Sequence, residues 1–458
     1  MNVLLVITNI SGFHEVPYSF GISSIASYIK NKGYNVKILS IREENEFNKL
    51  IEEVNSFNPT VVGFTSVSSQ YNCVKKLAKL IKDVNEKIII VVGGVHVTLY
   101  PDALLETTDI DGIFVGESEL AFSDFLDKIN EGKDYRDTNN FAYRKYGRVI
   151  INTLTPLIRH LDILPYPIKD SLFEEFIEIN GYAPFLFSRG CPYLCSYCSN
   201  HALAKRYGMS HNTLRYRSVD SCINEIKDAL EKYKFDTVWF LDDTFGLDKK
   251  WGKEFCEKYK REINIKFICL LRPNVVDEEF IKLLKAARCY RILFGIESGN
   301  EYVRNTIMNR NISNEQIIMV FSLCRKYGIE TCAFNIIGVP GETEDMLGDT
   351  IKLNRKIRPT DSGVSIYYPY KGTVLGDYSF SKGLVNQKMY EDFSNERRDT
   401  VLNYPEKYKE KLRYYYENWE ILIYPYKINK RIIKKRIIAL FGENSIVTNI
   451  LRKIKKNF

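Results

Sequence analysis

Short apolar runs alternate with amphipathic segments along most of this 458-residue chain, and the alternation limits the folds open to it. Over the first 130 residues, runs of strand length are separated by segments of helical periodicity. Such alternation predicts a doubly wound parallel sheet, which binds ligands beyond the carboxyl ends of its strands. The expected strands are Val3–Thr8, Asn35–Leu39, Val61–Thr65, Ile88–Val92 and Ile113–Val115, with helices at Gly21–Asn31, Cys73–Asp83 and Leu120–Ile129.

The loops that follow these strands are rich in glycine and small polar residues. Ordinary turns have the same composition, but four such loops at one edge of a sheet favour a binding face. The loops are residues 8–12, 65–69, 93–96 and 116–119.

A second series of strands and helices begins near Phe185. Its six βα repeats are two short of a closed eight-stranded barrel, so they predict an open, partial (β/α)6 barrel with its site at the carboxyl ends of the strands. The expected strands are Phe185–Ser188, Thr237–Phe240, Lys266–Leu270, Arg291–Gly295, Thr331–Ile337 and Asp361–Tyr368. The expected order is a Rossmann-like (flavodoxin-like) domain at 1–140, a linker at 141–180, the partial barrel at 181–385 and a helical, basic region at 386–458.

Three cysteines, Cys191, Cys195 and Cys198, follow the first strand of the second series. Thiolates this close usually share a metal, but a structural zinc site needs four ligands and no second Cys or His pair follows. The other seven cysteines show no disulfide framework and no secretory signal precedes them, so we expect reduced thiols. A four-iron cluster with three cysteine ligands and one open iron position is favoured over zinc and over free thiols.

Polar residues and glycines also fall at the ends of the later strands of this series. Each could be a solvated acid or a turn glycine, but together around an open iron position they favour a bound small molecule. They are Asp242, Asp243, Arg272, the segment 295–299 and the segment 338–342.

Positive charge is concentrated at the end of the chain. The formal net charge is +8, and residues 427–458 contain ten Lys or Arg and one acid, Glu443. Isoleucines and lysines alternate there at helical spacing, which predicts an amphipathic basic helix. Such a helix could pack on the barrel, lie on an anionic membrane or, less readily, bind nucleic acid. The sequence contains no run of eighteen uncharged apolar residues, so we expect no transmembrane helix.

Several motifs resemble those of a known superfamily: SRGCPYLCSYCSN, FLDDTFGLD, FGIESGNE, IIGVPGET and, in degraded form, YPYKGT. Through them, residues 185–373 resemble the radical S-adenosylmethionine (SAM) superfamily. Upstream, PYSFGISSIASYIKNKGYNV, VGGVHVTLYPDALL and FVGESE resemble the cobalamin-binding domain of one branch of that superfamily. The resemblance makes 181–385 a radical SAM core and covers most of the chain.

The resemblance implies three cofactors: a [4Fe-4S] cluster on Cys191, Cys195 and Cys198, SAM chelated by the fourth iron, and cobalamin. An electron from the cluster would cleave SAM to methionine and a 5′-deoxyadenosyl radical. Beyond the cluster, no catalytic residue is assigned. For SAM, the resemblance implies Asp242 and Asp243 at the amino group, Arg272 at the carboxylate, Glu297 and Ser298 at the ribose, and Tyr197, Ile337, Gly338 and Val339 near the adenine. The residues implied for cobalamin are Ser11, Gly12, Ser66, Ser68, Gly93, Gly94, His96, Gly116 and Glu117.

The first loop departs from the Asp-x-His-x-x-Gly motif through which some cobalamin domains place a His on cobalt. His14 is present, but Gly12 stands in place of the Asp and Pro17 in place of the Gly. His96 does not fit the motif either. We therefore expect cobalamin to bind without a His ligand.

The implied activity is cobalamin-dependent methylation of an unactivated carbon, in a small-molecule or lipid-like substrate. Radical cyclisation or rearrangement without methyl transfer stays open, as does a non-catalytic cobalamin-binding module. A tRNA methylthiotransferase is disfavoured, because only Cys73 precedes the cysteine triplet and the C-terminus reads as helical. The implied partners are the substrate and an electron donor such as flavodoxin or ferredoxin, with no specific nucleic acid. The expected location is cytoplasmic, with peripheral contact at the inner face of the membrane through the basic helix.

Overall fold

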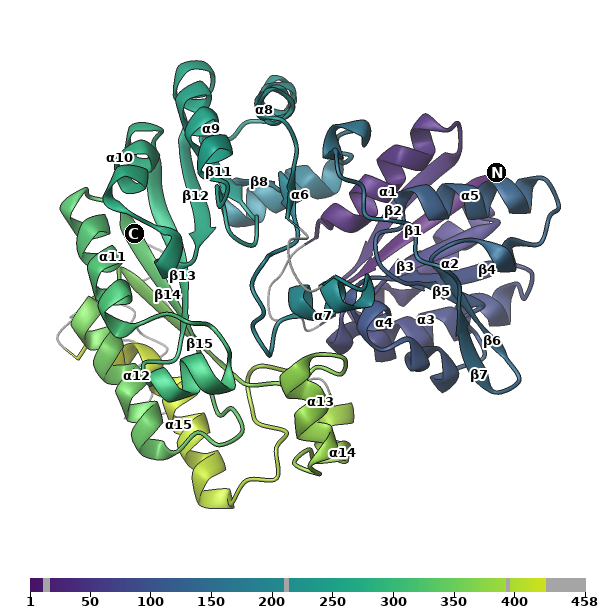
Figure 1. The fold of residues 1–458 in the computed structure, drawn as a ribbon. Helices are drawn as coiled ribbons and strands as arrows, with labels where there is room; N and C mark the ends of the chain where they lie inside the picture. Colours follow the sequence, from purple (N-terminus) through teal and green to yellow (C-terminus); the bar gives the residue numbers. More distant parts are fainter. Residues whose placement is uncertain (11–16, 210–213, 393–395, 426–458) are drawn as a thin grey trace, which may run out of the picture.

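Two α/β lobes lie side by side in the computed structural model, which describes residues 1–10, 17–209, 214–392 and 396–425 (Figure 1). The N-terminal lobe contains a seven-stranded sheet, and the second lobe contains a six-stranded one. Both sheets are built mainly from parallel strands, as the alternation of strands and helices predicts.

The first sheet has the strand order β2-β1-β3-β4-β5-β6-β7, and its first five strands are parallel. This 2-1-3-4-5 order confirms the flavodoxin-like prediction and puts the topological switch between β1 and β3. The strands are β1 (Asn2–Thr8), β2 (Asn35–Ile41), β3 (Val61–Thr65), β4 (Ile89–Gly93), β5 (Gly112–Phe114), β6 (Phe141–Lys145) and β7 (Arg148–Ile151).

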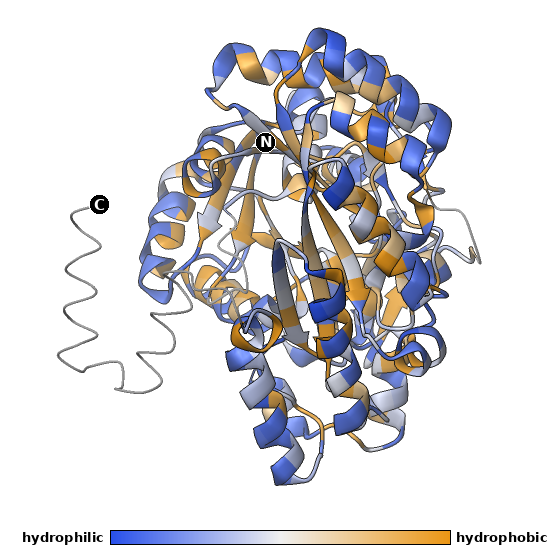
Figure 2. Cartoon of the chain, turned by 90° about the vertical axis from the view of Figure 1, so that its left-hand side faces the viewer, coloured by the Kyte–Doolittle hydropathy of each residue, from blue (hydrophilic) through white to orange (hydrophobic). Residues whose placement is uncertain are grey.

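Helices cover both faces of this sheet because its strands alternate apolar side chains between two cores. Val3 and Leu5 pack with α1 (Phe20–Asn31) and α5 (Glu119–Asn130). Leu4 and Val6 pack with α2 (Phe47–Phe57) and α3 (Tyr71–Val84). In Figure 2 the hydrophobic strands lie inside and the helices show hydrophilic outer faces.

The hairpin β6–β7 extends this sheet to Ile151, past residue 140 where the sequence places the start of a linker. Tyr146 and Gly147 both have positive φ (51° and 72°), as a tight hairpin turn requires. The helix α6 (Ser171–Asn180) also falls in the expected linker, and its Phe173 and Phe176 are buried in the core of the second lobe. The connecting segment without regular strands or α-helices is therefore shorter than expected.

The second sheet confirms the open barrel, with six parallel strands in the order β8-β11-β12-β13-β14-β15. The first strand ends earlier than expected, because the chain bends into a separate two-stranded ribbon of β9 (Ser188–Arg189) and β10 (Arg215–Tyr216). The strands are β8 (Ala183–Phe185), β11 (Thr237–Phe240), β12 (Lys266–Leu271), β13 (Cys289–Glu297), β14 (Glu330–Ile337) and β15 (Asp361–Ile366).

Helices line the outside of the barrel strands (Figure 1). The last of them packs on β15, where Trp419 is buried and donates from its indole N–H to the Ser362 hydroxyl (2.9 Å). The aromatic-rich C-terminal helix thus covers the edge of the barrel. The helices are α8 (Val219–Lys232), α9 (Lys249–Glu262), α10 (Glu278–Ala286), α11 (Asn314–Lys326), α12 (Glu344–Ile357) and α15 (Glu406–Ile423).

Two short helices, α13 (Val374–Ser381) and α14 (Gln387–Glu391), lie below the gap between the lobes in Figure 1. The Asn72 side-chain amide donates to the Glu391 carbonyl (3.1 Å), and the Lys371 ammonium lies 4.0 Å from the Tyr100 ring centroid. These contacts tie the two lobes together on this side.

The basic helix expected in residues 427–458 lies outside the described residues. Within the described part of the chain, no helix combines the length and the apolar composition that crossing a bilayer requires.

Candidate functional site

The three cysteines occupy the loop between β9 and α7 (Ser199–Arg206), at the carboxyl end of the first barrel strand. Cys195 is buried, and Cys198 caps the N-terminus of α7. Burial raises the pKa of the Cys198 thiol to about 12, and burial also raises the pKa of Cys191. Thiolates are the form that binds a metal, so metal binding at Cys191 and Cys198 would release protons.

A single zinc ion and a four-iron cluster place different demands on the spacing of these thiols. No three His, Cys, Asp or Glu side chains in the described ranges are grouped closely enough to hold one metal ion. A four-iron cluster spreads its thiolates over different irons, so it accepts a wider arrangement than a single zinc ion does. The cluster on these three cysteines therefore stays a prediction from the sequence.

Two buried arginines surround Cys195 and Tyr197. Arg272, at the end of β12, donates to the Cys195 sulfur (3.1 Å) and to the Arg310 carbonyl (2.7 Å), with its guanidinium 3.7 Å from the Tyr193 ring centroid. Arg310 donates to the Tyr197 hydroxyl (2.5 Å). The resemblance implies a SAM carboxylate for Arg272, whereas here its guanidinium lies against Cys195.

The two neighbouring acids after β11 have different surroundings. Asp242 is buried, accepts hydrogen bonds from the Ser188 hydroxyl and the Phe187 N–H (3.2 Å), and has its pKa raised to about 6 by burial. Asp242 therefore anchors the start of the cysteine loop. Asp243 is exposed to the cavity described below, where surrounding protein raises its pKa. Of the two, only Asp243 is available to a ligand amino group.

Glu297 sits on a strand irregularity at the end of β13, where the register with β14 shifts. Its backbone is left-handed (φ 66°), a conformation that costs a non-glycine residue on the order of 1 kcal/mol. The bulge directs its carboxylate to Arg310 (3.2 Å). Ser298 is fully buried, with its hydroxyl 3.3 Å from that of Thr350. In this arrangement the Glu297 carboxylate is paired with Arg310 and the Ser298 hydroxyl is buried, so neither is free to contact a ribose.

The segment after β14, expected near adenine, is also well packed. Ile337 and Val339 are fully buried. The Gly338 N–H donates to the Glu342 carboxylate (2.5 Å), and the Gly338 carbonyl accepts from the Tyr404 hydroxyl (3.3 Å). Burial raises the pKa of Glu342 to about 7. Glu342 thus fixes the backbone of this loop.

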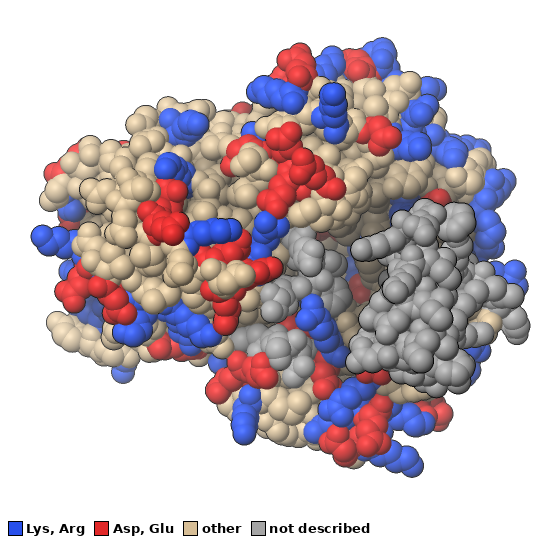
Figure 3. Space-filling view, turned by 180° about the vertical axis from the view of Figure 1, so that it is seen from behind, with Lys and Arg blue, Asp and Glu red and all other residues tan. Residues whose placement is uncertain are grey.

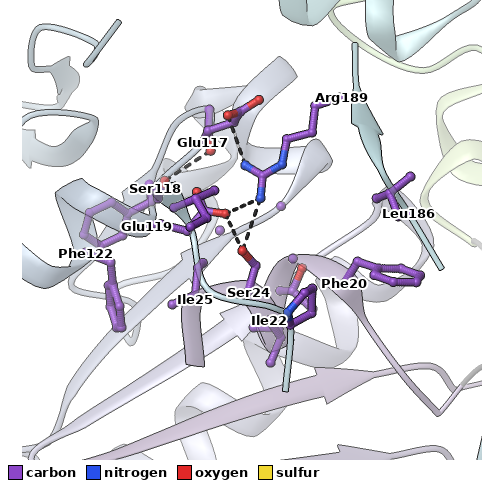
Figure 4. A pocket seen from close by; sticks show the side chains of 18 of the residues that line it. Phe20, Ile22, Ser24, Ile25, Glu117, Ser118, Glu119, Phe122, Leu186 and Arg189 are labelled. Carbon is purple, nitrogen blue, oxygen red and sulfur yellow. Dashed lines mark hydrogen bonds and ion pairs between the residues drawn. The ribbon is translucent and has the colours of Figure 1, made fainter. Parts of the chain in front are cut away.

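A cavity of about 410 Å³ opens between the lobes, at the carboxyl edge of the first sheet. Its walls are mainly apolar and come from β1, β3, α1 and α5 on one side and from the start of the cysteine loop on the other (Figure 4). The volume lies in the range of small-molecule sites. The expected cobalamin residues that line it are Gly93, Gly94, Gly116 and Glu117, and the expected SAM residue is Asp243.

Glycines keep this edge accessible. An added Cβ at Gly93 would have no protein atom within 4 Å, so any side chain there would enter the cavity. At Gly94 (φ 98°) a Cβ would lie 2.6 Å from the Ser66 carbonyl, so the backbone turn requires glycine. Gly93 therefore leaves the cavity open at this edge of the sheet.

Several expected cobalamin residues do not line the cavity. His96, in α4 (Val95–Leu99), is buried between Tyr71 and Tyr100, with Nδ1 3.1 Å from the Ser68 hydroxyl. Burial lowers the pKa of His96 to about 4, so its ring is neutral. Ser66 donates to the Val67 carbonyl (2.9 Å). The sequence places these residues correctly at the strand ends, but their side chains point into the protein. Ser11, Gly12 and His14 lie outside the described residues.

The sequence gives no individual role to Arg189, Arg310 or Tyr207. Arg189 lies within the SRGC motif, which marks it, but its partners Glu117 and Glu119 are about 70 residues away. Arg310 and Tyr197 are 113 residues apart. Pairs this distant leave no local spacing pattern, so only the folded chain reveals them.

Family models match the two lobes separately. The model of the radical SAM superfamily matches residues 185–353, and that of the B12 binding domain matches residues 8–126.

Curated relatives match most of the chain. An uncharacterized methyltransferase of Pyrococcus horikoshii is 30% identical over 372 residues, covering 80% of this chain and 79% of that protein. An anaerobic magnesium-protoporphyrin IX monomethyl ester cyclase of Rubrivivax gelatinosus is 26% identical over 362 residues, covering 76% of this chain and 64% of that protein.

Among solved structures, the radical SAM methyltransferase TsrM of Kitasatospora setae, with cobalamin and a [4Fe-4S] cluster bound, aligns with a TM-score of 0.70 and 18% identity. The alignment covers 83% of this chain and 75% of that one. At this identity the likeness shows a shared fold.

Proposed function

Because the chain belongs to the radical SAM superfamily and carries a B12 binding domain, we propose that it methylates an unactivated carbon of a small-molecule or lipid-like substrate. Its cofactors are a [4Fe-4S] cluster, SAM and cobalamin. When bound, the cluster supplies the electron that cleaves SAM, and cobalamin supplies the methyl group. An electron donor such as flavodoxin or ferredoxin would reduce the cluster.

The observation that carries the proposal is the shared cavity. Gly93 and Gly94 line it from the cobalamin-binding lobe, and Arg189, Gly190 and Asp243 line it from the radical SAM lobe. Methyl transfer to a carbon requires the methyl donor and the hydrogen-abstracting group to reach one substrate. A cavity lined by both rims provides that common space.

We assign roles to the residues that the geometry leaves available. Cys191, Cys195 and Cys198 hold the cluster, and Asp243 accepts a hydrogen bond from the amino group of SAM. Arg310 holds Tyr197 beside the cluster loop. The apolar side chains of Leu186, Leu203 and Leu241 line the cavity and keep water from a reactive centre.

Turnover with methyl-labelled SAM tests the proposal. The anaerobically reconstituted holoenzyme is incubated with a low-potential reductant and small-molecule or lipid extracts. We expect S-adenosylhomocysteine and 5′-deoxyadenosine in equal amounts, together with a product that carries the label by mass spectrometry.

The cyclase relative favours a second candidate, radical cyclisation without methyl transfer. In that case deoxyadenosine accumulates alone and no product carries the label. Absence of both SAM-derived products under reductant would instead indicate a non-catalytic cobalamin-binding module.

We also propose that the basic C-terminal segment contacts anionic membranes. Its support is the sequence pattern, in which Ile428, Ile432 and Ile433 recur at helical spacing among lysines and arginines. Basic residues near an anionic surface contribute about 1 kcal/mol each. On the face seen in Figure 3, by contrast, positive and negative side chains are interspersed, which does not favour a nucleic-acid surface.

Liposome sedimentation tests this membrane contact. We expect the full chain to sediment with anionic vesicles, to bind less at higher salt and to lose binding on truncation after Tyr426. Vesicles of neutral lipid are the control. Equal sedimentation of the full-length and truncated chains would instead favour packing of the segment on the barrel.

A further inference from the structure

A partly buried cluster of polar and charged residues joins the rim of the cobalamin-binding lobe to the cysteine loop (Figure 4). The Arg189 guanidinium contacts Glu119 (2.6 Å) and Glu117 (3.1 Å) and donates to the Ser24 hydroxyl (3.2 Å). Arg215 contacts Glu117 as well (2.5 Å). We call these five residues, Ser24, Glu117, Glu119, Arg189 and Arg215, the rim clamp.

The rim clamp brings two like charges together. Arg189 and Arg215 are directly paired across the β9–β10 ribbon, an arrangement that by itself is unfavourable. The Glu117 carboxylate lies between them and binds both guanidinium groups. The ribbon therefore depends on an acid from the other lobe for its charge balance.

Two of the charged side chains in the rim clamp are largely shielded from water. The Glu119 side chain is only 5% exposed and that of Arg215 only 9%. Burial alone would raise the pKa of Glu119, but the neighbouring Arg189 holds it below its usual value. Buried ion pairs often add little net stability, and their better-attested use is to fix one register. A bidentate arginine suits that use because its fork fixes angles as well as distance.

A second contact reaches the same rim from the other end of the cysteine loop. The helix α7 follows Cys198 and is followed in turn by Tyr207, whose hydroxyl accepts a hydrogen bond from the Glu117 N–H (2.8 Å). A Cβ at Gly116 would lie 2.1 Å from that hydroxyl. Arg189 before the first cysteine and Tyr207 after the last one thus contact the same turn, Gly116–Glu117.

We propose that the rim clamp sets the separation of the two cofactors across the substrate cavity, with Arg189 as the principal positioning residue. This inference rests on the proposed placement of the cluster on the three cysteines and of cobalamin at the glycine-rich rim. On the opposite side, the lobes are tied by Asn72 to Glu391 and by Lys371 to Tyr100. The lobes also meet elsewhere, where Tyr18 packs in the core of the second lobe and Arg42 pairs with Glu175 (2.6 Å). Loss of the clamp would therefore loosen the rim at the cavity without separating the lobes.

The test measures the magnetic interaction between Co(II) cobalamin and the reduced cluster in the holoenzyme, by continuous-wave and pulsed dipolar EPR. Arg189→Met keeps an unbranched apolar stem and removes the charged guanidinium group. We expect the cobalt–cluster distance distribution to broaden and to shift to longer distances, while iron and cobalamin contents stay at the wild-type level. Arg189→Lys keeps the positive charge but not the forked guanidinium group. Its cobalt–cluster distance distribution should lie between those of the wild type and Arg189→Met.

Arg291→Met is the matched control. Arg291 pairs with Glu330 (2.5 Å) and Asp361 (3.1 Å) where the barrel strands begin, so its loss removes an ion-pair cluster without touching the rim. We expect its distance distribution to match that of the wild type. If Arg189→Met does not fold, Glu119→Gln removes one ion pair of the clamp and is measured in the same way.

The outcomes separate this inference from the proposal on which it rests. A wild-type holoenzyme whose cobalt and cluster signals do not interact would contradict the cofactor placement itself. With that interaction present, a distribution in Arg189→Met that overlays the wild type would overturn the positioning role. Loss of cobalamin from a folded Glu119→Gln variant would overturn it too, because the clamp would then serve binding.

Discussion

Replacing Cys191, Cys195 and Cys198 together with alanine is expected to abolish iron binding and SAM cleavage completely. The three thiols lie in one loop, and Arg272 donates a hydrogen bond to the Cys195 sulfur. Each single replacement is expected to have the same result, because a cluster with only two protein ligands leaves two irons open. Iron content, visible absorption and deoxyadenosine release after anaerobic reconstitution measure the loss.

The control for this change replaces Cys73 and Cys332, which are half-buried and lie outside the cysteine loop. This double variant should keep its iron and its activity. A triple variant at 191, 195 and 198 that still binds four irons per chain would sink the cluster assignment, and loss of iron from the control would point to other ligands.

Local patterns predict most of the fold of the described residues. The expected helix at Leu120–Ile129 is found as α5 at Glu119–Asn130, because its apolar side chains recur at helical spacing and are buried on one face. The hairpin β6–β7 gives no such signal. Its turn residues are Tyr146 and Gly147 instead of the usual Asn-Gly, and its outer strand is largely exposed, so no clear apolar alternation marks it.

The sequence predicts which residues lie at the strand ends, but it does not predict the direction in which each side chain points. Gly93, at the end of β4, and His96, in α4, are three residues apart, yet the first lines the cavity and the second is buried beside Ser68. Asp242 and Asp243 likewise divide into an internal anchor and an exposed acid. These choices depend on residues brought in from elsewhere in the chain, such as Ser188 for Asp242.

Replacing Gly93 with phenylalanine is expected to weaken cobalamin binding at least about tenfold, equivalent to about 1.4 kcal/mol. Gly93 ends β4 at the cavity, its φ is not positive, and an added Cβ meets no protein atom within 4 Å. The backbone therefore accepts a side chain there, and the ring would occupy the space that a ligand needs. Equilibrium dialysis with cobalamin, followed by absorbance of the retained fraction, measures the change.

Gly348→Phe is the matched control, because a Cβ at Gly348, in α12, also meets no atom within 4 Å and the residue lies away from the cavity. The two variants should unfold at similar temperatures, and only Gly93→Phe should lose cobalamin. Iron binding should be retained in both, since neither residue lies in the cysteine loop. Wild-type cobalamin affinity in a folded Gly93→Phe variant would show that cobalamin does not enter this cavity, and the argument that one cavity serves both cofactors would fail with it.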